Sequence, residues 1–320
     1  MKYCYIINPT AGQKPVIARF IPLIEKAFAV TKLPYEIAVT EYSGHATELV
    51  KRMSDMNDSI RVCSMGGDGT LNEVVTGAIG RDNVEIGCYP CGSGNDFIKC
   101  FGTREDFSDF EYIIDASSVD IDVIKVNDRF CINIFSLGLD ANVANDIPYY
   151  RRLPGVSGPM AYNLSLMANF LRKLGSPVTL TIDGISEKTE SLLLAVCNGQ
   201  VYGGGFKAAP EAVTNDGILD ILSVSTMNRA RILKVIPIYK NGLHISSGEI
   251  RDSLKDVITY KKTDKLFIEA DRDTLVNLDG EVTKMTKMDI SIIPKGVKFL
   301  LPYDLNKENN LEHSLHNKNI

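Results

Sequence analysis

Short apolar runs and stretches with helical spacing alternate along the first third of the chain. The runs have the length of strands and lie at Tyr3–Ile7, Tyr35–Val39, Ile60–Met65 and Val84–Tyr89. Between them, apolar residues recur every three or four positions in the stretches 16–28, 46–53 and 71–79, which predicts helices. Strands joined by helix-sized crossovers predict a parallel sheet, and ligands of such sheets bind beyond the carboxyl ends of the strands.

After about residue 115 the pattern changes to short β-rich segments separated by turns. These lie at 121–126, 130–135, 178–182, 192–197, 219–224, 266–270 and 290–293, with helical stretches near 160–174 and 229–239. The pattern predicts an antiparallel sheet, arranged as a sandwich. We therefore expect a fold of the α/β plus all-β class.

The pattern predicts two domains: an N-terminal parallel-sheet α/β domain over 1–115 and a C-terminal antiparallel β-sandwich domain over 116–305. In this prediction the segment at about 295–305 packs back on the first domain. Residues 306–320 are rich in polar residues, and we expect them to form a frayed tail.

Composition narrows the class of protein. The 320 residues are 44% hydrophobic and 23% charged, which excludes disordered, collagenous and coiled-coil chains. A formal net charge of −5 provides no global positive field, so we expect no nucleic-acid partner. The longest apolar runs fall far short of the roughly 20 residues that cross a bilayer, and we expect neither a membrane span nor a signal peptide.

The seven cysteines favour a cytoplasmic protein, because their number is odd and four of them lie in apolar, strand-like segments. Cys88 and Cys91 have the spacing of a redox or zinc pair. No histidine lies at zinc-finger spacing, and the pair runs directly into a glycine-rich turn. We therefore interpret it as part of that turn.

Glycine-bearing loops follow three of the predicted strands: Asn8–Gly12, Gly66–Asn72 and Gly92–Asp96. Glycine lets a backbone approach an anionic ligand closely, and a helix N-terminus presents N–H donors to it. Loops that meet at one sheet edge predict a nucleotide triphosphate site. The alternative is that they are only structural turns. Neither a G-x-x-x-x-G-K-[ST] motif nor a complete G-x-G-x-x-G fingerprint is present.

Asp68 lies inside the second glycine loop, where its charge would repel phosphates. A carboxylate there needs a cation or strong hydrogen-bond donors. Mg²⁺ bridging to a nucleotide meets that need. We also expect Asn95 and Asp96 to hydrogen bond with Asp68 and so to fix the two loops relative to each other.

Four elements together resemble the diacylglycerol kinase catalytic-domain family, which includes soluble bacterial diacylglycerol kinases and the sphingosine and ceramide kinases. The elements are Asn8-Pro-Thr-Ala-Gly12, Gly66-Gly-Asp-Gly-Thr-Leu-Asn72, Gly92-Ser-Gly-Asn-Asp96 and Asp279-Gly-Glu281. The Gly-Gly-Asp-Gly element alone also occurs in phosphofructokinases and NAD kinases. The resemblance implies an ATP-binding α/β domain followed by a β-sandwich domain, with the active site between them.

The resemblance also implies the residues that bind ATP. They come from all three glycine loops and the end of the second strand: Asn8, Pro9, Thr10, Ala11, Gly12, Thr40, Gly66, Gly67, Asp68, Gly69, Thr70, Leu71, Asn72 and Ser93. Family members often carry Thr where this chain has Ser93 and Ser where it has Ala11. Ser93 keeps a hydroxyl, whereas Ala11 offers only its backbone N–H.

Phosphoryl transfer to an alcohol needs in-line positioning, a metal ion and a carboxylate that accepts the hydroxyl proton. By resemblance the acceptor is Asp279, with Glu281 as a supporting carboxylate or metal ligand and Asp68 as the third catalytic residue. Which of Asp279 and Glu281 takes the proton stays open. The pattern around Asp279-Gly280 also fits a simple β-turn, and a turn would aim the carboxylates.

A further acidic stretch precedes a predicted strand at 219–224. In the bacterial family members a similar stretch holds a structural Mg²⁺, which implies the Asp216 side chain with the carbonyl groups of Val213 and Ile218 as ligands here. An Asx turn explains the same residues.

These observations predict an ATP- and Mg²⁺-dependent lipid kinase that converts diacylglycerol to phosphatidic acid. We expect it in the cytoplasm, transiently at the inner membrane face, and a homodimer is compatible with the pattern. Basic pairs that could attract anionic headgroups are Arg151-Arg152, Arg172-Lys173 and Lys261-Lys262, although each also fits a solvated surface.

Three alternatives stand beside this prediction. The acceptor could be another lipid, a sphingoid or a polyprenyl alcohol. The enzyme could be a soluble-substrate kinase of the NAD kinase or phosphofructokinase type, against which the late Asp-Gly-Glu argues. Finally, the chain could be a nucleotide-binding regulator without catalysis.

Overall fold

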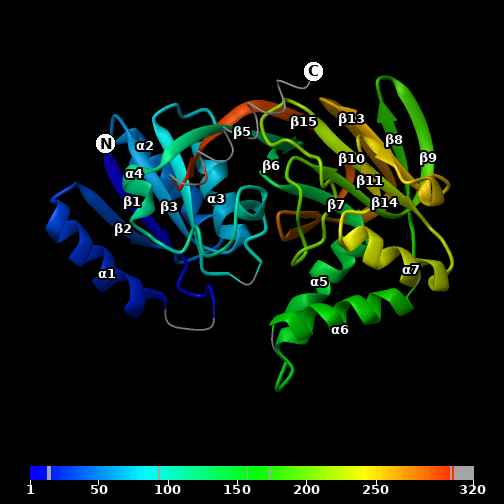
Figure 1. The fold of residues 1–320 in the computed structure, drawn as a ribbon, viewed down its shortest axis with the longest axis horizontal. Helices are drawn as coiled ribbons and strands as arrows, with labels where there is room; N and C mark the ends of the chain where they lie inside the picture. The colour runs from blue at the N-terminus through cyan, green and yellow to red at the C-terminus, as the bar shows by residue number, and fades with distance from the viewer. Residues whose placement is uncertain (13–15, 93, 157, 173, 303–304, 306–320) are drawn as a thin grey trace. The chain divides into compact units, whose positions relative to one another are not determined.

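The computed structural model describes residues 1–12, 16–92, 94–156, 158–172, 174–302 and 305 (Figure 1). The chain forms two compact units. The first comprises Met1–Ile121 and the chain from Lys295 onward, and the second comprises Asp122–Pro294. The predicted polar tail at 306–320 lies outside the described residues.

The first unit is built on a parallel sheet. Its strands are β1 (Lys2–Ile7), β2 (Tyr35–Val39), β3 (Ile60–Gly66) and β4 (Val84–Pro90), in the order β2-β1-β3-β4. Lys298 and Phe299, near the end of β15 (Glu281–Leu301), add a further parallel pairing to β4. The helices are α1 (Val16–Thr31), α2 (His45–Asp55), α3 (Asp68–Ala78) and α4 (Tyr112–Asp115), with a 3-10 turn η1 (Phe97–Cys100).

The predicted apolar stripes of these helices form the core of the first unit. Phe20, Ile24 and Phe28 of α1 are buried in one cluster with Tyr3 and Tyr5 of β1. Burial of large apolar side chains is the main favourable term in folding. For α1, α2 and α3 the sequence period therefore predicted both the helix and the side on which it packs, whereas the short α4 was not predicted.

The second unit is antiparallel, with the strand order β13-β10-β9-β7-β14-β15, and β8 also pairs with β9 and β14. The strands not yet given are β5 (Ser117–Val126), β6 (Arg129–Cys131), β7 (Ile134–Gly138), β8 (Ser176–Ile182), β9 (Ile185–Cys197), β10 (Leu219–Ser225), β11 (Ile245–Ser246), β12 (Glu249–Ile250), β13 (Ile258–Thr263) and β14 (Lys265–Leu278). The helices are α5 (Leu139–Arg151), α6 (Gly158–Leu171) and α7 (Arg229–Lys240), with a 3-10 turn η2 (Asp252–Leu254). The α/β plus all-β class is thereby confirmed.

Strand β9 explains the long apolar run in the sequence. Leu194 and Val196 belong to one buried cluster, whereas Leu193, Ala195 and Cys197 belong to another that includes residues of α7. Successive side chains of a strand point to opposite faces. The run is continuous because both faces of this strand are covered.

Two predictions about secondary structure were wrong. The single strand expected at 130–135 is broken into β6 and β7, because the backbone N–H groups of Ile132 and Asn133 bind a carboxylate instead of a neighbouring strand. Helix α5 was not predicted, since its sequence includes Asn142, Asn145 and Pro148, which weaken the helical pattern.

None of the described helices is both long and apolar enough to cross a membrane. None of the seven cysteines, all of which lie in described parts of the chain, is joined in a disulfide. Burial raises the pKa of Cys88, and it raises the pKa of Cys91 to about 11, so both are protonated at neutral pH. Neither thiol has the lowered pKa of a redox-active pair, which agrees with interpreting the two residues as part of a turn.

Candidate functional site

The predicted glycine loops of the first unit meet at one edge of its sheet. Because β1 to β4 are parallel, their carboxyl ends, with the segments after Ile7, Val39, Gly66 and Pro90, share that edge. Thr40 directly follows β2, and its backbone N–H donates to Ile7 O at 2.9 Å. The sheet topology therefore brings together the loops that the sequence pattern singled out.

Asn8 joins the first loop to the second. Its Nδ2 donates to Thr70 Oγ1 at 3.0 Å, and its Oδ1 accepts from the backbone N and the hydroxyl of Thr10 at 3.0 and 2.8 Å. A single amide side chain thus orders its own turn and holds it against the first turn of α3.

Asp68 joins the second loop to the third. Its carboxylate accepts from the backbone N–H groups of Asn95 and Asp96 at 2.8 and 2.7 Å. This confirms the predicted contact between the two loops. Strong donors therefore satisfy the half-buried carboxylate, and Asp68 does not require a cation for its own stability.

Glycines make the close approach of these loops possible. A Cβ on Gly92 would lie 2.6 Å from Gly67 Cα, and a Cβ on Gly94 would lie 2.6 Å from Asp68 Oδ2. Both distances are far below van der Waals contact. Glycine is therefore required at each position for packing one loop on another.

The predicted ATP contacts differ in their accessibility. Pro9, Thr10 and Gly12 are exposed, whereas Thr70, Leu71 and Asn72 are buried. Leu71 belongs to the core, and its backbone N–H already donates to Gly67 O at 3.1 Å. The predicted contact at Ser93 lies outside the described residues.

Sequence reasoning missed Glu73, which follows the second loop within α3. Its carboxylate accepts from the backbone N–H groups of Gly44 and Ala46 at 2.8 and 3.1 Å, at the start of α2. A carboxylate at a helix N-terminus satisfies unpaired donors and interacts well with the helix dipole. Glu73 thereby ties the turn after Thr40 to the helix that begins at Asp68.

In the second unit, Asp279 and Gly280 form the turn between β14 and β15. Both have positive φ values, 49° and 98°, as a two-residue Asp-Gly hairpin turn requires. Oδ2 of Asp279 accepts from Ile132 N at 2.7 Å, and Oδ1 accepts from Asn133 N at 3.1 Å and Ile134 N at 2.9 Å. The predicted turn is present, and it fixes the carboxylate on backbone donors.

A hydrogen-bond chain leads from this turn to Asp140 of α5. Gly280 N donates to Asn277 Oδ1 at 2.9 Å, and Asn277 Nδ2 donates to Asp140 Oδ2 at 3.2 Å. Ser136 Oγ donates to the same Asp140 oxygen at 2.5 Å. Sequence reasoning did not identify Asp140, although its position just after Gly138 at the end of a strand was an available signal.

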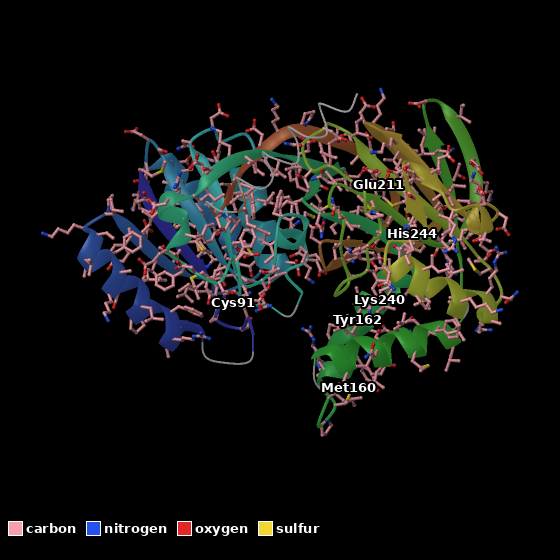
Figure 2. All side chains as sticks on the ribbon, in the orientation of Figure 1. Cys91, Met160, Tyr162, Glu211, Lys240 and His244 are labelled. Atoms are coloured by element: carbon pink, nitrogen blue, oxygen red, sulfur yellow. The ribbon has the colours of Figure 1, made fainter. Side chains whose placement is uncertain are left out.

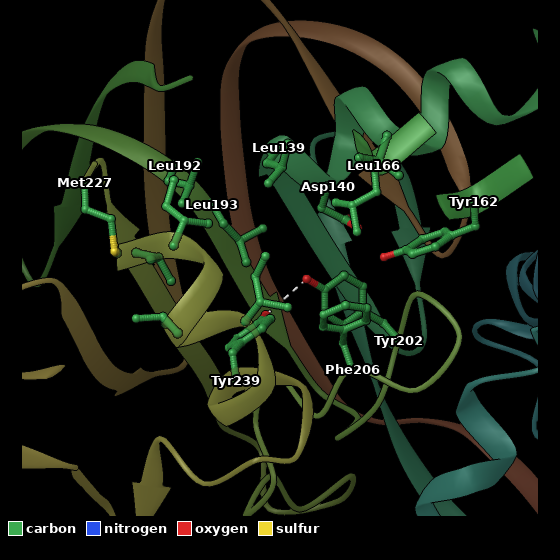
Figure 3. A pocket seen from close by; sticks show the side chains of 15 residues that line it. Leu139, Asp140, Tyr162, Leu166, Leu192, Leu193, Tyr202, Phe206, Met227 and Tyr239 are labelled. Carbon is green, nitrogen blue, oxygen red and sulfur yellow. Dashed lines mark hydrogen bonds between the residues drawn. The ribbon is translucent and has the colours of Figure 1, made fainter. Parts of the chain in front are cut away.

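Asp140 also lines an apolar cavity of about 80 Å³ in the second unit (Figure 3). The walls come from α5, α6, α7, β9, β10 and the loop after β9, and they are mostly leucine, isoleucine, valine and aromatic side chains. Tyr202 and Tyr239 hydrogen bond to each other at 3.1 Å within it. Among the described lining residues Asp140 is the only acidic or basic one, so the cavity suits an apolar chain with a polar end.

The predicted Mg²⁺ ligands near Asp216 lie at the surface of the second unit. Val213 and Asp216 are exposed, and Asp216 Oδ1 accepts from Ile218 N at 3.0 Å, which is the Asx turn considered as an alternative. Partial burial, with the nearby Asp220 and Asp122 carboxylates, raises the pKa of Asp216. Within the described ranges, no cluster of three or more His, Cys, Asp and Glu side chains could hold a metal.

Two family models match the chain. The diacylglycerol kinase catalytic domain matches residues 2–126, and the YegS C-terminal NAD kinase beta sandwich-like domain matches residues 133–301. The two matches meet near the change from parallel to antiparallel sheet. The second covers more than half of the chain.

Curated relatives are similar over nearly the whole length. A diacylglycerol kinase of Bacillus subtilis is 27% identical over 93% of this chain and 95% of its own length. A diacylglycerol kinase of Staphylococcus aureus is 26% identical over 95% and 93%.

Two crystal structures from Bacillus anthracis have the same fold. One, of a putative diacylglycerol kinase, has a TM-score of 0.73 at 24% identity, covering 95% of this chain and 98% of that chain. The other, of a diacylglycerol kinase, has a TM-score of 0.67 at 22% identity with the same coverage. With the family models and the curated relatives, they lead to one conclusion: the chain belongs to the diacylglycerol kinase family and is a kinase.

Proposed function

We propose that this kinase transfers the γ-phosphate of ATP to the free hydroxyl of diacylglycerol, giving phosphatidic acid. The observation that carries the proposal is the hydrogen-bond chain from the Asp279 turn to Asp140 in the apolar cavity. It connects the turn that carries Asp279 to a cavity that suits an acyl chain. A soluble phosphate acceptor would have no use for such a cavity.

The phosphate groups of ATP bind, in this proposal, at the carboxyl edge of the parallel sheet in the first unit. The N-terminal turn of α3 supplies backbone N–H groups there, and the dipole of the helix favours anions. The hydrogen bonds of Asn8 and Asp68 hold the three loops together, and Arg104 donates to Gly92 O at 2.8 Å in the third loop.

Asp279 is the proposed proton acceptor, with Glu281 as the supporting carboxylate. Three backbone N–H groups donate to the two oxygens of the Asp279 carboxylate and hold it in a fixed orientation. That suits phosphoryl transfer, in which positioning contributes more than proton abstraction. Asp68, in the first unit, is the proposed third catalytic residue beside the phosphates.

Mg²⁺ is the proposed metal, and the Asp216 region is its proposed structural site. Two observations support a cation there: Asp220 Oδ2 is buried without a hydrogen-bond partner in the described chain, although Oδ1 of the same residue pairs with Lys262, and the pKa of Asp216 is raised by partial burial and, to a smaller degree, by the Asp220 and Asp122 carboxylates. Asp216 would supply its side chain, with the carbonyl groups of Val213 and Ile218. A bound ion would neutralise this negative charge.

An acceptor panel tests the proposed function. The purified protein is incubated with ATP and Mg²⁺ and with diacylglycerol, sphingosine, undecaprenol or NAD, and labelled phosphate is followed in each product. We expect transfer to diacylglycerol and loss of transfer when a chelator removes Mg²⁺. Transfer to another lipid alone would replace diacylglycerol as acceptor, and transfer to NAD alone would exclude a lipid kinase.

A further inference from the structure

Helix α6 buries small and polar residues. Ala161, Ser165 and Asn169, spaced four apart, are buried on the side that packs against α5. Ser165 Oγ donates to Val143 O at 2.7 Å, and Asn169 Nδ2 donates to Asp146 Oδ2 at 3.1 Å. Small side chains let the two helices approach closely, so this packing does not require large apolar residues.

The large apolar residues of α6 are instead exposed. Spacings of four, three and four positions place them on one side of the helix, here named the outer α6 face. Its members and their exposed fractions are Met160 at 49%, Leu164 at 39%, Met167 at 63% and Leu171 at 68%. A contiguous apolar stripe of this kind marks an interaction surface.

Figure 1 shows α6 at the edge of the second unit, away from its strands, and Figure 2 shows Met160 at one end of the helix. The residues of α6 include no Asp, Glu, Lys or Arg. The outer α6 face is therefore apolar from end to end, with no charged side chain to oppose entry into a lipid environment.

Arginines flank the outer α6 face at both ends. Arg151 and Arg152 are exposed at the end of α5, which leads into α6. At the other end, Arg229 donates to the carbonyl oxygens of Phe170, Leu171 and Arg172 at 3.0 to 3.3 Å. Carbonyl oxygens carry no full charge, so Arg229 keeps its positive charge at the surface.

A third side of α6 faces the apolar cavity. Tyr162 and Leu166 project from the helix into it, beside Asp140 and Phe206 (Figure 3). One short helix thus separates an apolar surface from the cavity that we assign to the acyl chain.

We propose that the outer α6 face docks on an anionic lipid bilayer, and that the acyl chain of the acceptor passes beside α6 into the cavity. The cavity part rests on the proposed function, whereas bilayer association does not. At about 21 Å for 14 residues, α6 is too short to span a membrane and would lie in its interface. A second copy of the chain fits less well, because a stable dimer needs about 20 to 30 residues on each side.

The test compares two double variants in sedimentation with vesicles of phosphatidylcholine and phosphatidylglycerol. Met167→Asn with Leu171→Asn removes the most exposed part of the outer α6 face. Ile185→Asn with Leu243→Asn is the matched control, since both residues are exposed apolar residues of the same unit, at 74% and 61%. We expect the first variant to lose about tenfold or more in vesicle partitioning and the control to match the wild type.

Two results would overturn the docking surface. The first is failure of vesicle sedimentation to show the effect: either the wild-type protein does not sediment with these vesicles, or the outer-face variant sediments as well as the wild type. The other is a wild-type dimer in light scattering that the outer-face variant converts to a monomer while vesicle binding is unchanged, which would assign the face to a second copy.

Kinase assays on two substrates distinguish a loss of docking from misfolding of the variant and from failure of the proposed function. On diacylglycerol in vesicles we expect the outer-face variant to lose about tenfold in rate, and on a water-soluble short-chain diacylglycerol to stay within about twofold of the wild type. Equal loss on both substrates would overturn a docking role. If the wild type phosphorylates neither substrate, the proposed function fails, and vesicle sedimentation alone decides the docking surface.

Discussion

Two aspartates of this kinase are held by backbone N–H groups. Asp68 accepts two such bonds from the third glycine loop, and Asp279 accepts three from the break between β6 and β7. A buried carboxylate without partners is costly, whereas each charge-assisted hydrogen bond contributes about 1.5–3 kcal/mol. These bonds therefore hold each carboxylate in one orientation.

Asp279→Asn tests which carboxylate accepts the proton. We expect kcat with diacylglycerol to fall by about 100-fold or more, because a positioned general base contributes about that much. ATP should still raise the melting temperature, since the loops proposed to bind the nucleotide belong to the other unit. The measurements are steady-state kinetics in mixed micelles and thermal melting with and without Mg-ATP.

Glu281→Gln is the matched comparison for Asp279→Asn. We expect its kcat to fall by less than about tenfold, as for a supporting group. A larger loss in Glu281→Gln than in Asp279→Asn would assign the proton to Glu281. In Asp279→Asn the introduced amide NH₂ would face a backbone N–H, so melting of the ATP-free variants checks that the second unit still folds.

At the scale of elements, hydrogen bonds between α3 and the start of α2 position a loop of the first unit. Glu73 of α3 caps the start of α2, and Thr47 Oγ1 of α2 donates back to Glu73 O at 2.7 Å. Gly44, at φ 89°, makes the sharp turn just before α2. The position of the turn after Thr40 is therefore set by its hydrogen bonds to Glu73 of α3.

Glu73→Gln should weaken ATP binding through this tie. The amide keeps one acceptor oxygen and places an NH₂ group against the other N–H, which costs about 1–3 kcal/mol of stability. We expect the KM for ATP to rise about threefold to tenfold with kcat nearly unchanged. Glu48→Gln is the control, because its carboxylate is exposed on α2 and accepts from the Tyr42 hydroxyl, an exposed contact that does not join α2 to α3. Equal KM values for the two variants would exclude a positioning role for Glu73.

At the scale of the whole molecule, the net charge of −5 opposes approach to an anionic membrane. The exposed arginines at 151, 152 and 229 provide a local positive field beside the outer α6 face. A local field acts over a Debye length, which is about 8 Å at physiological ionic strength. The proposed docking would therefore depend on this local arrangement and not on the net charge of the chain.

Added salt should weaken vesicle association without abolishing it. Screening removes the attraction of the arginines, while burial of the outer α6 face persists. We expect partitioning to anionic vesicles to fall about threefold to tenfold between low and high salt. Vesicles of phosphatidylcholine alone are the control and should show little change. Binding to anionic vesicles that is insensitive to salt would contradict a role for the arginines.

The sequence by itself determined the fold class, the helices of the first unit with their buried sides, and the family. These features are local: an apolar period sets the side on which a helix such as α1 packs, and glycine marks turns in which the backbone approaches another loop closely. The contact between Asp68 and the third loop was predictable as well, because parallel strands bring their carboxyl ends to one edge.

Only the tertiary structure decided the rest. Asp279 binds an N–H group 147 positions away in the sequence, and the cavity draws its walls from segments far apart in the chain. The sequence of α6 is apolar on several sides, so its period does not say which side is outside. Packing decides that, because Ala161, Ser165 and Asn169 approach α5 closely and leave the larger apolar residues in solvent.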